Sequence, residues 1–254
     1  QIYASNSNEN TYTDLWTDRY FGFMHLIRTF RNTATPMRLK PLNVYYHMYS
    51  GERISALNAL LANLDYARQQ SICPVTAGRY TAIANGFFTT RIQAVGDAQW
   101  QIDHRGALQT IRFDRATFRS VDFNRSHGVV GQTHLQGSLY VALDRSVQRP
   151  LIALQPIDSS YAPPAAESPY LIDGRWEVWG LKTLSIGFRF ETRGYGHGEL
   201  TWKVPQPGLY EVTIRNHEET DQTWRWRSNA NGILEMNLGD QGIQPRMVLV
   251  RRVA

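Results

Sequence analysis

The stretch Ser185-Ile-Gly-Phe-Arg-Phe190 decides the fold of the larger part of the chain, because apolar side chains alternate along it with small or polar ones. This alternation has the period of a β-strand, which points successive side chains to opposite faces of a sheet. About twelve short runs that favour strands follow one another after residue 86, separated by turn signals such as Asp173-Gly174 and Asn231-Gly232. The pattern predicts an antiparallel β-sandwich over residues 87–254. The clearest runs are Gln99–Asp103, Leu108–Phe113, Leu139–Leu143, Leu151–Leu154, Arg175–Trp179, Leu184–Phe190, Leu200–Val204, Tyr210–Ile214, Thr223–Arg227 and Met247–Val250.

Residues 1–86 have a different periodicity, which indicates helices and short buried strands. Apolar residues recur at helical spacing over residues 20–30 and again over residues 54–64. Between them, the mostly apolar run 41–47 predicts a buried strand of a mainly parallel sheet. This order is typical of an α/β domain, and it is too short to close a sheet or barrel alone. The whole chain is therefore expected to be α+β. The apolar stripe of the second helix consists of Ile54, Leu57, Leu60, Leu61 and Leu64.

Composition excludes several classes of protein. The 254 residues are 42% hydrophobic and 12% aromatic, which is too apolar for a disordered chain. A single cysteine, Cys73, cannot form an internal disulfide, and we expect it to be a small buried apolar side chain. No run approaches the roughly 18 apolar residues of a membrane-spanning helix. The net charge of +5 comes mainly from scattered arginines, which favours solvated strand faces over a nucleic-acid interface.

The chain begins with Gln1 rather than an initiator methionine, and its first residues do not form a signal peptide. Gln1-Ile-Tyr-Ala already resembles the end of a strand. We therefore expect a mature or excised fragment whose upstream part is missing.

His47 is the strongest candidate for chemistry. It follows the run 41–47 and precedes Ser50-Gly51, which places it at the carboxyl end of the expected parallel strand. Sites of α/β folds form at this edge of the sheet, and a histidine there can act as a general acid or base near neutral pH. The alternative is a structural histidine that is hydrogen-bonded to a loop.

Two aromatic segments are candidates for contact with a sugar. The first is the polar lead 6–14, which contains Asn10 and Tyr12 and is followed by Trp16. It has the hydrogen-bonding groups and the aromatic platform of a sugar groove, although an exposed loop has the same composition. The second is the pair Trp224 and Trp226, which alternate with arginine and therefore share one face of a strand. That face is either core or a patch on which sugars stack.

A family resemblance covers most of the chain and is dense over residues 8–86. The segments Asn8–Trp16, Gly22-Phe23, Arg38–Gly51 and Pro74–Ala77, with Tyr80, resemble the last part of a polysaccharide deacetylase domain of the carbohydrate esterase family 4 type. The similarity is greatest to the C-terminal region of the PelA-like proteins that modify the Pel exopolysaccharide. The β-rich remainder, including Ser126–Gly131, loosely resembles the region that follows in those proteins.

The resemblance implies metal-dependent removal of N-acetyl groups from an amino-sugar exopolysaccharide. Tyr46-His47 matches the late motif of the family, whose histidine protonates the departing amine, and the Trp16 segment resembles part of the groove wall. The family's Asp-Asp and His-x-x-x-His motifs do not occur in this chain and would lie upstream of Gln1. The resemblance thus implies a divalent metal, zinc by preference, in the complete protein but none held by this chain alone.

These observations leave two functional hypotheses open. In the first, residues 1–86 end a polysaccharide N-deacetylase domain, with His47 catalytic and with Asn10, Tyr12, Trp16, Tyr46, Trp224 and Trp226 in contact with substrate. In the second, residues 87–254 form a non-catalytic module that binds glycan or braces an exopolysaccharide assembly system. Both imply a periplasmic or secreted bacterial protein that binds a polysaccharide. The further partners would be the missing upstream catalytic region and exopolysaccharide secretion proteins, without nucleic acid or a membrane span.

Overall fold

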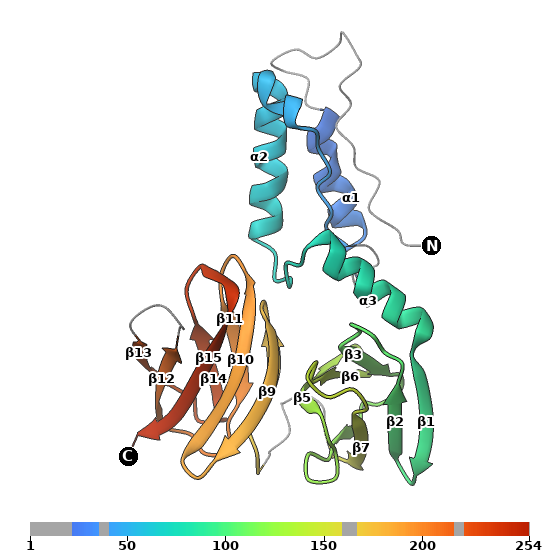
Figure 1. The fold of residues 1–254 in the computed structure, drawn as a ribbon, viewed down its shortest axis with the longest axis vertical. Coiled ribbons are helices and arrows are strands. Elements are labelled where there is room, and N and C mark those ends of the chain that lie inside the picture. The colour runs from blue at the N-terminus through green and yellow to red at the C-terminus, as the bar shows by residue number, and fades with distance from the viewer. Residues whose placement is uncertain (1–21, 36–40, 159–166, 216–220, 254) are drawn as a thin grey trace. The chain divides into compact units, whose positions relative to one another are not determined.

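The computed structural model describes residues 22–35, 41–158, 167–215 and 221–253 (Figure 1). The protein is a mixed α+β protein with few helices and mostly antiparallel sheets. It divides into two compact units, Gln1–Ser71 and Ile72–Ala254. The boundary expected from the sequence, after residue 86, falls inside a helix of the second unit.

The first unit is helical in its described part. It contains the 3-10 helices η1 (Gly22–His25) and η2 (Met48–Glu52) and the α-helices α1 (Leu26–Asn32) and α2 (Ile54–Arg68). A small core joins them, because Phe23, Leu26 and Phe30 pack against Ala59 and Leu60. Asn63 fixes the contact by donating a hydrogen bond of 3.0 Å to the carbonyl oxygen of Phe23.

Two expectations for this unit are wrong. Residues 41–47 do not form a strand, since only Tyr45 takes part in a β-bridge. The leucine stripe of α2 does not face the core either: Leu60 is buried, but Ile54 is 72% exposed. The buried face of α2 instead carries small residues, Ala56 and Ala59, and Ala59 belongs to the core shared with η1 and α1. Leu57, Leu61 and Leu64 are exposed together with Ile54.

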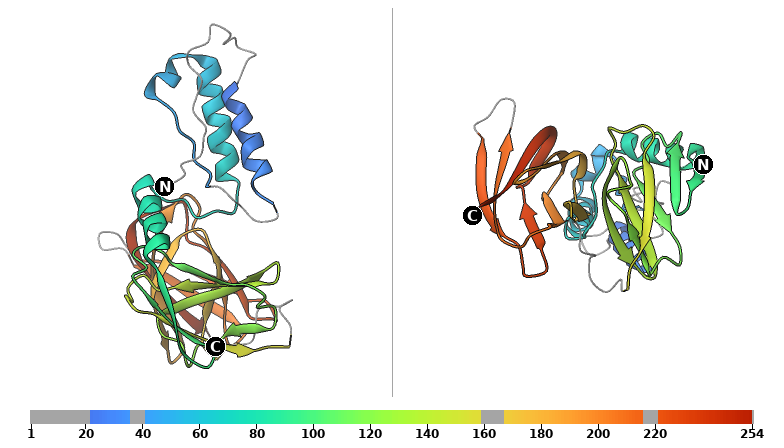
Figure 2. Two further views of the ribbon diagram at one scale, coloured as in Figure 1. Left: turned by 90° about the vertical axis from the view of Figure 1, so that its right-hand side faces the viewer. Right: turned by 90° about the horizontal axis from the view of Figure 1, so that it is seen from below.

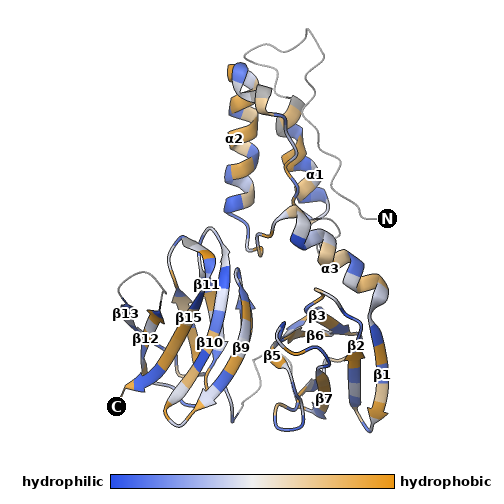
Figure 3. Cartoon of the chain, viewed as in Figure 1, coloured by the Kyte–Doolittle hydropathy of each residue, from blue (hydrophilic) through white to orange (hydrophobic). Residues whose placement is uncertain are grey.

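The first helix of the second unit is α3 (Ala77–Thr89), and the fifteen strands found among the described residues follow it. Thr76 caps α3, because its hydroxyl accepts a hydrogen bond from the backbone N–H of Arg79. The strands alternate hydrophobic and hydrophilic residues (Figure 3). Their bounds are β1 Arg91–Gly96, β2 Gln99–Asp103, β3 Thr110–Phe113, β4 Arg119–Val121, β5 Val129–Leu135, β6 Ser138–Leu143, β7 Leu151–Pro156, β8 Tyr170–Gly174, β9 Glu177–Leu184, β10 Gly187–Tyr195, β11 Glu199–Lys203, β12 Leu209–Arg215, β13 Gln222–Arg227, β14 Ile233–Asn237 and β15 Gln241–Val253.

Three sheets are built from these strands, and their course can be followed from two further sides in Figure 2. Their orders are β1-β2-β7-β4, β13-β12-β15-β10-β9 and β14-β11-β8-β5-β6-β3. Nearly all of the neighbouring strands are antiparallel. The exception is the parallel pair β5–β8, at Gly131 and Leu171, which makes the third sheet continuous.

Two hydrophobic cores stabilise the second unit. The first lies among β2, β3, β6 and β7 and includes Ile102, Leu139 and Ile152. The second joins the five-stranded sheet to β11 and β14, with Phe188 and Phe190 against Trp202 at ring-centroid distances of 4.8 and 4.7 Å.

The glycine-rich segment 194–198 has a packing role in the second core. The buried indole of Trp176 lies so close to Gly194, Gly198 and Gly242 that an added Cβ would meet it at 2.1, 2.8 and 2.5 Å, respectively. The indole N–H donates a hydrogen bond to the carbonyl oxygen of Gly196. Glycine is required at these positions because any side chain would occupy the volume of the ring.

No helix among the described residues has both the length and the apolar character needed to cross a membrane.

Candidate functional site

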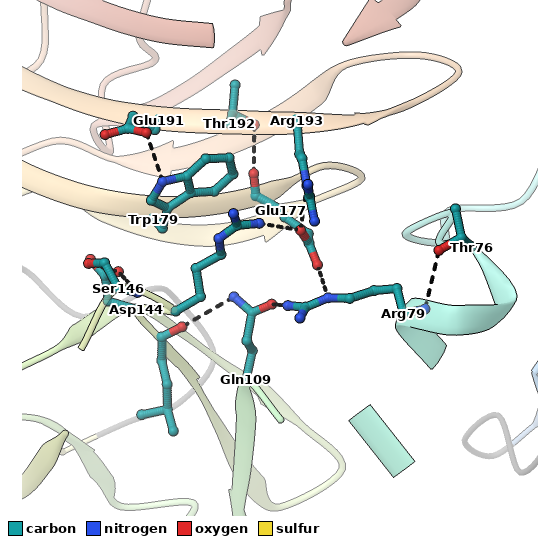
Figure 4. Close-up of polar contacts among 12 residues, drawn as sticks. Thr76, Arg79, Gln109, Asp144, Ser146, Glu177, Trp179, Glu191, Thr192 and Arg193 are labelled. Atoms are coloured by element: carbon teal, nitrogen blue, oxygen red, sulfur yellow. Dashed lines mark hydrogen bonds and ion pairs between the residues drawn. The ribbon is translucent and has the colours of Figure 1, made fainter. Parts of the chain in front are cut away.

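Three arginines surround Glu177, the first residue of β9. Its carboxylate is only 9% exposed and accepts from three arginines. Nε of Arg79 lies 2.5 Å from Oε1, while Nη1 of Arg145 and Nε of Arg193 lie 2.9 and 3.1 Å from Oε2. Figure 4 shows Arg79 and Arg193 reaching this carboxylate from α3 and β10.

Three separate parts of the second unit position these arginines. Arg79 is in the first turn of α3, and its Nη2 also donates a hydrogen bond of 2.5 Å to Oε1 of Gln109. Arg193 pairs directly with Glu177 across the β9–β10 ladder. Arg145 follows β6, and its guanidinium lies 3.8 Å from the ring centroid of Trp179. This cation–π contact places the guanidinium over the indole ring.

Positive charge is in excess at this cluster, which we call the Glu177 cluster and define as Arg79, Arg145, Glu177 and Arg193. Burial alone would raise the pKa of Glu177, but the hydrogen bonds and charges of Arg79 and Arg193 outweigh it and place that pKa below its ordinary value. Burial, followed by repulsion from Arg193, lowers the pKa of Arg145. Three cations therefore share one carboxylate.

A pocket of about 170 Å³ opens beside the cluster. Arg79, Glu177 and Arg193 supply its charges, and Thr76, Tyr195 and Ile243 lie on its wall. Tyr195 is 39% exposed and Ile243 is 62% exposed, so the rim offers an aromatic and an aliphatic surface. The arrangement can bind a small anion that also carries an apolar face.

A larger hollow of about 360 Å³ lies beside the turn between β9 and β10. Its wall is mostly uncharged and includes Ile186, Phe188 and Tyr210, with Arg252 at one side. Glu167 and Arg252 are the charged residues in its lining, one of each sign, so this hollow has no comparable excess of charge.

His47 lies in the first unit and is the residue immediately before η2. It is half-buried, and its ring meets Tyr45 edge to face at a centroid distance of 5.2 Å. Its neighbours Tyr45, Tyr46 and Met48 are 49%, 41% and 88% exposed. The structure therefore brings His47 and Tyr46 onto one accessible segment, although this segment is not the strand end that the sequence predicts.

The other sequence-predicted residues fall into two groups. Asn10, Tyr12 and Trp16 lie outside the described residues. Trp224 and Trp226 share a face of the edge strand β13, with ring centroids 5.7 Å apart. Both are half-buried and pack against the second core, so they belong to its margin.

Cys73 is exposed, which corrects the expectation that it is buried. Among the residues that the structure describes, no three His, Cys, Asp or Glu side chains are grouped as metal ligands. The described residues thus do not fit the metal that the resemblance implies, and no step through a metal can be derived from them.

The sequence patterns do not predict the Glu177 cluster, because its members are far apart along the chain. Arg79 and Glu177 are separated by 98 positions, and each alone resembles an ordinary charged surface residue. The sequence pattern that could have indicated this site is the Arg-Gly-Tyr-Gly run that starts at Arg193. Gly194 in this run lies against the indole of Trp176, and Arg193 lines the pocket.

No protein-family model, no curated protein and no solved structure matches this chain.

Proposed function

We propose that the chain forms the later part of a polysaccharide N-deacetylase that acts on an N-acetylated amino-sugar exopolysaccharide. The observation that supports this proposal is the accessible segment Tyr45–Met48, where a half-buried histidine stands among exposed aromatic rings. Aromatic faces bind sugar rings, and a histidine at such a surface can exchange protons with a bound substrate.

In this proposal His47 is the general acid. Amide hydrolysis adds water to the acetyl carbonyl carbon and then breaks its bond to nitrogen. The departing amine must gain a proton as that bond breaks, and the protonated imidazole of His47 supplies it. Tyr46 binds the sugar beside it. The attacking water and its base, with the divalent metal of the family, would come from residues upstream of Gln1, in a periplasmic or secreted protein.

The test is His47→Ala in the complete protein, including the residues that precede Gln1. We expect amine release from an acetylated amino-sugar polymer to fall at least about 100-fold, as for loss of a general acid. The control is His25→Ala, which removes an exposed histidine of the same unit. Near-normal activity of the His47 variant would remove the proposal.

We also propose that the second unit contains a β-sandwich. A core that draws on both the five-stranded sheet and the strands β11 and β14 supports this interpretation. Two sheets that pack face to face around one core form a β-sandwich, and lectin domains are among the proteins with a double-sheet architecture.

A second candidate function is therefore non-catalytic glycan binding by this unit. The specific observation is the stacked, half-buried pair Trp224 and Trp226 on the edge strand β13. We expect amino-sugar oligomers to quench tryptophan fluorescence and expect Trp226→Ala to lose the response. Trp100→Phe is the control, because Trp100 packs on Phe113 in the other core. Unchanged quenching in Trp226→Ala would show that the tryptophan pair is not the glycan-binding surface.

A further inference from the structure

We propose that the pocket beside the Glu177 cluster is a binding site for a sugar that carries a carboxylate, such as a hexuronate residue. This inference goes beyond the proposed deacetylase and does not depend on it. All of the residues that line the pocket belong to the second unit.

The charge of the pocket favours an anionic ligand. Two arginines, Arg79 and Arg193, and one carboxylate, Glu177, line the pocket, so its charged lining has a net charge of +1. Arg79 and Arg193 line the pocket, whereas Arg145 is held on Trp179. A second anion beside these arginines would relieve the repulsion that three like charges impose on one another.

The guanidinium of Arg193 supplies hydrogen-bond donors for this anion. Arg193 uses only Nε in its contact with Glu177, and within the described part of the chain its two terminal nitrogens have no further hydrogen bond. Its side chain is 38% exposed. The two terminal nitrogens of a guanidinium form a planar fork that matches the two oxygens of a carboxylate. The fork of Arg193 is thus available to a ligand.

The size of the pocket and the chemistry of its wall favour a sugar. A volume of about 170 Å³ suits one sugar ring rather than a long ligand. Tyr195 follows Arg193 by two positions on β10, so both side chains lie on the same face of that strand. A ring held on Tyr195 would bring a carboxylate on that ring toward the Arg193 fork, while Thr76 offers a hydroxyl group to the ring hydroxyls.

An inorganic anion would use only part of this wall. Phosphate can accept from the arginines, but it has no apolar face for Tyr195 or Ile243. The combination of a guanidinium fork with an exposed aromatic ring therefore favours a carboxylated sugar over free phosphate.

The test is calorimetric titration of the 254-residue chain with methyl glucuronide, methyl glucoside and inorganic phosphate. We expect binding of the glucuronide, at least about tenfold weaker binding of phosphate, and no binding of the uncharged glucoside. Phosphate binding as tight as that of the glucuronide would overturn the assignment to a sugar. Binding of the glucoside at the same strength would overturn the role of the carboxylate.

Two variants locate the site. Arg193→Lys keeps the charge but loses the fork, and we expect it to weaken glucuronide binding about tenfold. Tyr195→Ala leaves the Glu177 cluster intact, and we expect it to weaken the glucuronide but not phosphate. The matched control is Arg225→Gln on β13, an exposed arginine paired with Glu211. Full binding in both Arg193→Lys and Tyr195→Ala, with unchanged thermal unfolding, would overturn the proposal.

Discussion

Glu177 is the residue on which the local electrostatics of the second unit depend. Glu177→Gln would leave three guanidinium groups facing one another around a neutral amide. Removal of one partner from a buried ion pair costs about 3–5 kcal/mol, and the partial exposure of the arginines reduces this figure to about 2 kcal/mol. Urea unfolding at neutral pH measures this loss.

The control for this prediction is Glu211→Gln. Glu211 also accepts from an arginine, Arg225, but both side chains are open to solvent. We expect a change of less than about 1 kcal/mol there, as for other exposed pairs. Equal losses in the two variants would show that the Glu177 cluster is no more than a surface network.

The pH dependence of stability follows from the same carboxylate. Because the pKa of Glu177 is lower in the folded protein than its ordinary value of 4.5, its contribution is complete above about pH 4.5 and is lost as pH falls through the lowered pKa. We expect the stability gap between wild type and Glu177→Gln to be largest at neutral pH and to shrink in acid. Urea titrations at neutral and acid pH measure it, and a constant gap would contradict the assignment.

At the scale of elements, we predict that a side chain added at a glycine beside Trp176 destabilises the second unit. In Gly194→Ala the new methyl group would lie 2.1 Å from Cδ1 of the buried indole, so the ring must move. Overpacking of this kind costs about 1–3 kcal/mol. We expect a lower melting temperature and an altered near-ultraviolet circular dichroism spectrum.

Gly78→Ala is the matched control for this variant. Gly78 lies in α3, and nothing is within 4 Å of an added Cβ. Alanine favours a helix over glycine, so we expect this variant to be unchanged or slightly more stable. Equal destabilisation of both variants would mean that packing on Trp176 is not the cause.

The elements also show which sequence patterns are reliable. β2 has the predicted bounds of Gln99–Asp103, because local alternation and its flanking turns determine it. The segment 41–47 and the leucine stripe of α2 could not be placed in this way. An apolar run indicates that its side chains favour burial, but it does not indicate which neighbouring element covers them. In the first unit the buried face of α2 contains Ala56 and Ala59 rather than most of the leucine stripe.

At the scale of the whole molecule, contacts between residues that are distant in the sequence determine how the strands of the two cores are joined, and local sequence patterns do not predict these contacts. The parallel pair β5–β8 joins strands from the two cores of the second unit into one six-stranded sheet. Asp144 adds a second link, because its carboxylate accepts a hydrogen bond of 2.7 Å from the backbone N–H of Gly180. Neither contact leaves a local pattern, since each depends on how distant strands meet. The Glu177 cluster is of the same kind.

We therefore expect the second unit to unfold as one cooperative unit in the wild type, and we expect its two cores to unfold separately in Gly131→Ala. An added Cβ at Gly131 would lie 2.0 Å from the carbonyl oxygen of Leu171, so the β5–β8 pair must separate. Native-state hydrogen exchange should give Val141 and Val248, one from each core, the same opening free energy in the wild type and different ones in this variant. Gly187→Ala, which meets Val250 at the same distance within the second core alone, should lower both values together. Equal opening energies in Gly131→Ala would show that the Glu177 cluster and Asp144 suffice to hold the two cores as one.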